Sequence, residues 1–157
     1  ESWKWLAAEY AAFCITDNPY HRGLFASFGE PLYEAVVQLV QSTDPHVSAK
    51  ASHLVYIGTF SNPENHQGFV GAGAISALSN VLKNNPAPLQ FMWSAVALAN
   101  IGASYCLDEE GEVGRCDWEW GQEDRLKAEA IVASDGSASR LEMLKDPRLI
   151  QVLADQV

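Results

Sequence analysis

The sequence has no apolar run of 18 or more residues, and its 20 acidic residues outnumber its 10 basic ones. The first absence excludes a membrane-spanning helix. No basic start precedes an apolar stretch, so no signal peptide is predicted. The chain starts at Glu1, which leaves a removed targeting segment open. We therefore expect a cytoplasmic protein, or one of an organelle compartment if such a segment has been removed.

The excess of acidic over basic residues argues against a nucleic-acid partner. The net charge of −10 repels nucleic acid, which we do not expect as a partner. The segment from Asp108 to Asp124 holds eight carboxylates and one base, Arg115, so it carries −7 of that charge.

Cysteine is also scarce, with three residues in 157, which excludes a disulfide-rich scaffold. Cys14 lies in an apolar helical pattern and is expected to be a small buried side chain. Cys106 and Cys116 flank the acidic segment and could close it as a disulfide, or both could be free thiols. The sequence leaves this choice open because it does not establish an oxidising compartment.

An internal repeat is present instead. Shifting the sequence by 44 residues superimposes three apolar segments, in columns spaced by four and then three residues, which places them on one face of a helix. The columns are Trp3, Val47 and Phe91; Ala7, Ala51 and Ala95; Tyr10, Leu54 and Leu98; Phe13, Ile57 and Ile101. We expect these columns to form the core.

The segments between these helices repeat as well. Asn18-Pro19 and Asn62-Pro63 mark the breaks after the long helices, and Asp44-Pro45 opens the next one. At shifts of 42 and 45, Val36, Leu39 and Val40 match Leu78, Val81 and Leu82, and His21 matches His66.

The stretch 73–82 resembles the second helix of an armadillo repeat, and 95–101 resembles the third. The resemblance, to the armadillo/HEAT-like superfamily, covers residues 1–105. It implies an all-α fold, a right-handed α-solenoid of about three repeats with an acidic insertion in the last. We predict one domain over 1–157, with repeat helices in 1–105, the insertion in 107–121 and a modified repeat in 122–157. A helix is expected over 123–133, a second-helix equivalent over 139–145, and a third-helix equivalent opened by Asp146-Pro147.

The resemblance also implies that the third helices line a concave groove for a partner segment. The residues expected to line it are Trp5, Ala8, Ala12, Ala49, Ser52, Tyr56, Trp93, Val96 and Asn100, with contacts assigned to Trp5, Tyr56, Trp93, Val96 and Asn100. Trp5 and Trp93 could instead pack beneath neighbouring segments. Import receptors of this fold repeat a tryptophan–asparagine pair along the groove. Here only Asn100 matches, which argues against that function.

The acidic insertion alternates tryptophan with carboxylate. We expect Asp108, Glu110, Glu112, Trp118, Glu119 and Trp120 to form a docking loop for a basic or mixed apolar surface. The carboxylate spacing is similar to that of an EF-hand calcium loop, but Val113 stands where that loop needs glycine. No metal site is predicted.

Catalytic constellations are absent from the pattern, because the four histidines are scattered and no phosphate loop or nucleophile motif occurs. We predict a non-catalytic protein–protein interaction or scaffold module without a cofactor, a peripheral subunit of a larger assembly. The alternative is an accessory or lyase-like protein that holds a tetrapyrrole or another small ligand in its groove, as in the related bilin lyase subunits. A purely structural spacer is a third hypothesis.

Overall fold

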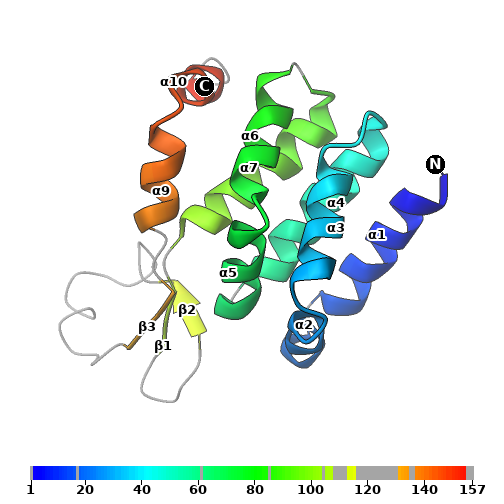
Figure 1. The fold of residues 1–157 in the computed structure, drawn as a ribbon, viewed down its shortest axis with the longest axis vertical. Coiled ribbons are helices and arrows are strands. Elements are labelled where there is room, and N and C mark those ends of the chain that lie inside the picture. Colours follow the sequence, from blue (N-terminus) through cyan, green and yellow to red (C-terminus); the bar gives the residue numbers. More distant parts are fainter. Residues whose placement is uncertain are drawn as a thin grey trace.

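A computed structural model describes residues 2–16, 18–60, 62–84, 86–103, 105–107, 113–115, 131–134 and 137–154. Figure 1 shows a predominantly helical molecule with a small sheet at one end. The helices are α1 (Ser2–Ile15), α2 (Pro19–Ala26), α3 (Glu30–Val40), α4 (Pro45–Thr59), α5 (Pro63–Gly71), α6 (Ala74–Lys83), α7 (Pro88–Gly102), α9 (Ser137–Leu144) and α10 (Pro147–Ala154); the strands are β1 (Tyr105–Leu107), β2 (Val113–Arg115) and β3 (Ile131–Ser134). The all-α class is confirmed for the body of the chain. No helix among the described residues is long and apolar enough to cross a bilayer.

Capping residues start the helices where the repeated breaks predict. The side chains of Asn18 and Asn62 accept hydrogen bonds from the first turns of α2 and α5, and proline follows each of them. Asp44 caps α4 in the same way. These side chains satisfy amide groups that have no partner inside the helix, which fixes the helix start.

Six helices form two similar sets. The first helix set is α2, α3 and α4, and the second is α5, α6 and α7. The long helices α1, α4 and α7 pack side by side, α3 packs on α4 and α6 on α7, and α5 packs against α2. Each helix of one set thus packs against its counterpart in the other set: α2 against α5, α3 against α6 and α4 against α7.

The predicted core columns are confirmed in α4, where Val47, Ala51, Leu54 and Ile57 are all buried. In α7 they are confirmed in part, because Leu98 and Ile101 are buried whereas Phe91 and Ala95 are half-buried. In α1 the prediction is wrong, because the large residues of the same columns, Trp3, Tyr10 and Phe13, are exposed. The reason is that α3 covers α4 and α6 covers α7, whereas no helix within the described residues covers that face of α1.

The second helices match at the predicted shift of 42 residues. Val36 and Leu78 occupy equivalent buried positions, as do Val40 and Leu82. The glycines that precede α3 and α6 are instead 44 residues apart. Gly29 and Gly73 have positive φ angles of 68° and 86°, a conformation that favours glycine.

A buried amide joins the two helix sets. Asn65 of α5 donates through Nδ2 to the carbonyl oxygens of Arg22 and Gly58, each at 3.0 Å, and its Oδ1 accepts from the Tyr33 hydroxyl at 2.9 Å. Gly68, one turn later, leaves room for the Tyr33 ring, which a Cβ atom at that position would overlap.

The small sheet has the order β2-β1-β3, with both pairings antiparallel. Residues 131–133, predicted as the end of a helix, lie in β3, so that part of the helix prediction is wrong. Pairing with β1 satisfies the backbone there, and Ile131 and Val132 are β-branched residues that favour strands. Residues 116–130 lie outside the described residues.

The two last helices do not take their predicted places. α10 packs on α6 and α9, and α9 packs on α7 and α6. α3, α6 and α10 thus form a row in which each helix packs on the next. The prediction gives the place after α6 to residues 139–145, of which 139–144 lie in α9, so it is wrong by one helix. Leu141 and Leu144 of α9 are exposed, whereas Leu149 of α10 is the buried leucine.

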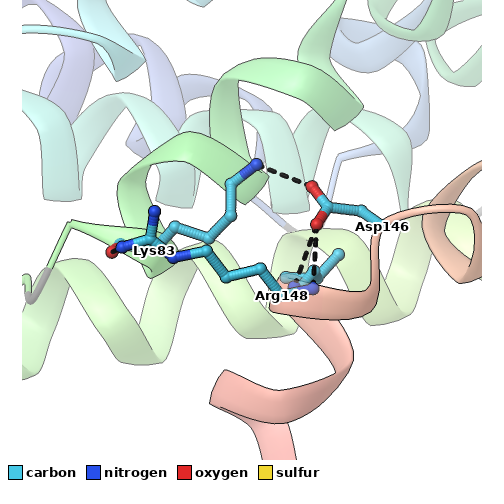
Figure 2. Close-up of polar contacts among 4 residues, drawn as sticks. Lys83, Asp146 and Arg148 are labelled. Carbon is cyan, nitrogen blue, oxygen red and sulfur yellow. Dashed lines mark hydrogen bonds and ion pairs between the residues drawn. The ribbon is translucent and has the colours of Figure 1, made fainter.

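Polar contacts attach α10 to α6, as Figure 2 shows. Lys83 Nζ donates to Asp146 Oδ2 at 2.6 Å, and Arg148 donates to the Lys83 carbonyl oxygen at 3.1 Å. Asp146 Oδ1 accepts from the amides of Arg148 and Leu149, so this carboxylate also caps α10.

A candidate protein-binding surface around Trp93

Buried polar contacts fix the position of α7 on α4. The hydroxyl oxygens of Ser52 and Ser94 lie 3.1 Å apart. Asn100 Nδ2 donates to Thr59 Oγ1 at 2.7 Å and to the Tyr56 carbonyl oxygen at 3.4 Å. Small hydroxyl side chains let the two helices approach closely, and the paired groups hold their register.

Next to this seam lies an aromatic group that we call the Trp93 cluster: His53, Tyr56, Phe60 and Trp93. The rings of His53 and Trp93 have centroids 3.9 Å apart, and the Tyr56 ring is 6.1 Å from Trp93. Phe60 lies 6.0 Å from Tyr56 and is 39% exposed. The three residues of α4 and its C-cap share one face, because they are spaced by three and four positions. The other three rings are half-buried, so one edge of the cluster faces solvent.

The electrostatics of the cluster favour an uncharged surface. Burial lowers the pKa of His53, the nearby Lys50 lowers it further, and Glu9 opposes this shift. Lys50 itself pairs with Glu9 of α1 at 2.5 Å. The lowered pKa favours the neutral imidazole of His53, so the cluster presents mainly uncharged aromatic rings.

The structure separates the predicted groove residues. Tyr56 and Trp93 meet in the cluster, while Val96 of α7 and Trp5 of α1 are half-buried. The prediction that Asn100 lines the groove is wrong, because its side chain is fully buried and bonded to α4. Ala8, Ala12, Ala49 and Ser52 are buried too, since they lie where neighbouring long helices meet.

Sequence reasoning missed His53 and Phe60. The available signal was their spacing from Tyr56, which puts all three on one face of the helix. Two other histidines have structural partners: His21 Nδ1 lies 2.8 Å from the Cys14 carbonyl oxygen, and His66 Nε2 lies 2.7 Å from that of Ile101.

The predicted docking loop falls outside the described residues, as do Asp108, Glu110, Glu112, Trp118, Glu119, Trp120 and Cys116. The backbone of Cys106 lies in β1, opposite Gly114 of β2. Residues 113–115, in the middle of the stretch with calcium-loop spacing, form a strand. Over the part of the chain that the structure describes, no three His, Cys, Asp or Glu side chains gather where they could hold a metal ion.

Comparisons with protein-family models, with curated proteins and with solved structures find no match to this chain. The case for a function therefore depends on the surface itself.

Proposed function

We propose that the chain is a short armadillo-like α-solenoid of about three repeats and serves as a non-catalytic protein-interaction module, a peripheral subunit of a larger assembly. The two helix sets support this proposal, because they recur at shifts near 44 residues and each packs on its counterpart. Such an array gives a rigid platform on which a partner segment can lie.

The Trp93 cluster is the observation that carries the proposal. Tryptophan and tyrosine dominate binding energy at interfaces, because they bury much apolar area and lose little side-chain entropy. Here the two helices that carry these rings, α4 and α7, are joined by buried hydrogen bonds next to the cluster. A partner would therefore meet a preorganised aromatic surface.

The partner that fits is a segment with an apolar anchor and basic flanks. The cluster offers mainly uncharged aromatic rings, and the chain as a whole carries −10. Attraction between opposite charges would raise the association rate, while the rings would supply most of the affinity. The carboxylates of 108–124 belong to the same proposal as a second contact.

The test compares Trp93→Ala with Leu24→Ala. Leu24 is 45% exposed and lies on α2, which packs against α1 and α5 and carries none of the cluster's rings, so it is the matched control. Wild type and both variants are purified gently from the native source, and the proteins retained by each are quantified by mass spectrometry. One of the retained proteins is then titrated calorimetrically against all three. We expect Trp93→Ala to weaken binding by more than about tenfold and Leu24→Ala to change it little.

Equal binding by wild type and Trp93→Ala would contradict the proposal. A pigment or small molecule that co-purifies with wild type but not with Trp93→Ala would favour the ligand-holding alternative instead. Circular dichroism of both variants ensures that a lost interaction does not reflect a lost fold.

A further inference from the structure

The outer face of α1 is apolar and exposed. Trp3 is 67% exposed, Leu6 56%, Tyr10 69% and Phe13 77%. Their spacing of three, four and three residues places them on one side of the helix. A contiguous apolar stripe of this size on a protein surface indicates an interaction site.

The matching columns show what kind of element covers such a face. Val47, Leu54 and Ile57 of α4 are 0%, 2% and 8% exposed because α3 packs on that helix, and α6 covers α7 in the same way. A groove of about 580 Å³ lies between α1 and α3, lined by Trp3, Lys4, Ala7, Ala35, Gln38 and Leu39. The groove and the stripe together fit a helix that packs on α1 and α3 at once.

The opposite end of the molecule has a helix in the matching row. α10 packs beside α6 and continues the row of α3 and α6, and α9 exposes Leu141 and Leu144 by 61% and 63%. Figure 1 shows α1 at one end of the helical rows and α9 and α10 at the other. α10 of another copy of the chain is therefore a helix of the right kind to occupy the place next to α3 and above α1.

We propose that copies of this chain stack head to tail, with the α9–α10 end of one copy on the α1 face of the next. α10 of the first copy takes the place before α3 in the second copy's row, and the leucines of α9 cover the aromatic stripe. A two-fold pairing of α1 with α1 would leave Leu141 and Leu144 exposed, whereas head-to-tail stacking covers both faces. This interface is heterologous, so growth continues beyond a dimer.

The available area is sufficient for a weak, reversible interface. The three exposed aromatic rings of α1 offer on the order of 400 Å² per copy, about half of what each partner gives to a standard interface. The groove and the α9 leucines extend it. The interface does not involve the Trp93 cluster, so this inference stands or falls independently of the proposed function.

The experiment blocks one end at a time in the full chain. Tyr10→Glu/Phe13→Glu blocks the α1 end, and Leu141→Glu/Leu144→Glu blocks the α9 end. Leu89→Glu, an exposed position on α7 that belongs to neither the α1 stripe nor α9, is the matched control. Sedimentation velocity is recorded over micromolar to near-millimolar concentrations for each protein and for an equimolar mixture of the two blocked variants.

We expect wild type and Leu89→Glu to form species larger than dimers, and each blocked variant alone to stay monomeric, with its dissociation constant raised by more than about tenfold. The mixture should give a one-to-one dimer and nothing larger. One variant contributes an intact α9 end, the other an intact α1 end, and the two remaining ends of that dimer are blocked. That dimer also shows that both variants are folded.

Three outcomes would overturn the inference. The first is a wild type that is monomeric throughout. The second is self-association of the Leu141→Glu/Leu144→Glu variant, which would indicate two-fold pairing through α1. The third is a mixture that stays monomeric while circular dichroism shows both variants folded.

Discussion

Single residues decide how closely the two helix sets approach. Gly23 of α2 and Gly68 of α5 occupy matching positions after His21 and His66. A Cβ atom at position 23 would meet nothing within 4 Å, whereas at position 68 it would overlap the Tyr33 ring. That ring is 5% exposed and its hydroxyl is bonded to Asn65, so it has little freedom to move away.

We therefore expect Gly68→Ala to lower the free energy of unfolding by about 1–3 kcal/mol through overpacking. Gly23→Ala should raise it by about 0.5–1 kcal/mol, because alanine is the better helix former and no steric contact opposes it. Urea denaturation of both variants measures the difference. Changes of the same sign at the two positions would show that the contact with Tyr33 does not limit the packing.

At the scale of elements, α10 depends on a carboxylate that serves two helices. Lys83 of α6 holds the pKa of Asp146 below its ordinary value of 3.8, and the amides of Leu149 and Arg148 at the start of α10 lower it further. As the pH falls, the unfolded chain takes up this proton first. The contribution of Asp146 to stability is thus present above its unfolded pKa and is lost as the pH falls through its folded pKa.

Asp146→Asn should accordingly reduce stability at pH 7 and remove part of the stability loss that we expect in wild type as the pH falls from about 5 to below 3.8. The effect is expected to be small, because the Asp146 side chain is 32% exposed and its ion pair is screened. Thermal melts over this pH range measure it, with Lys83→Met and the double variant completing the cycle. Strictly additive effects of the two substitutions would contradict a direct coupling.

Most helices could be predicted from local signals. Asn-Pro and Asp-Pro pairs carry their own capping groups, so the starts of α2, α4, α5 and α10 follow from the sequence. The places of α9 and α10 could not be predicted in this way. Which apolar side chains of a short helix become buried depends on the neighbour it meets, and the preceding strands break the repeat that would have identified that neighbour.

The binding surface was predictable only in part, for a similar reason. Periodicity placed Tyr56 and Trp93 outside the core columns of their helices, and both are half-buried in the structure. It could not show that Asn100 turns into the seam with α4, because a polar residue lies at a helix contact only when a partner such as Thr59 is opposite. Equally, the pattern of α1 matches that of a core helix, and only the packing shows that its face is open.

For the whole molecule, the net charge of −10 affects the two proposed surfaces in opposite ways. Screening weakens the attraction of a basic partner, but it also weakens the repulsion between stacked copies. Raising the salt concentration from about 0.05 M to about 0.5 M, which shortens the screening length several-fold, should therefore weaken partner binding and strengthen stacking. Calorimetry and sedimentation on the same sample measure both, and a shift of both in the same direction would contradict this division of surfaces.

The Asn65 amide has a consequence for how the molecule comes apart. It belongs to the second helix set, but its three partners, Arg22, Gly58 and Tyr33, all belong to the first. Separating the two sets would break these three hydrogen bonds together and expose the buried surface around them to water. We therefore expect the two sets to open as one cooperative unit, so that a protease that needs a locally opened chain finds little intermediate with only one set unfolded.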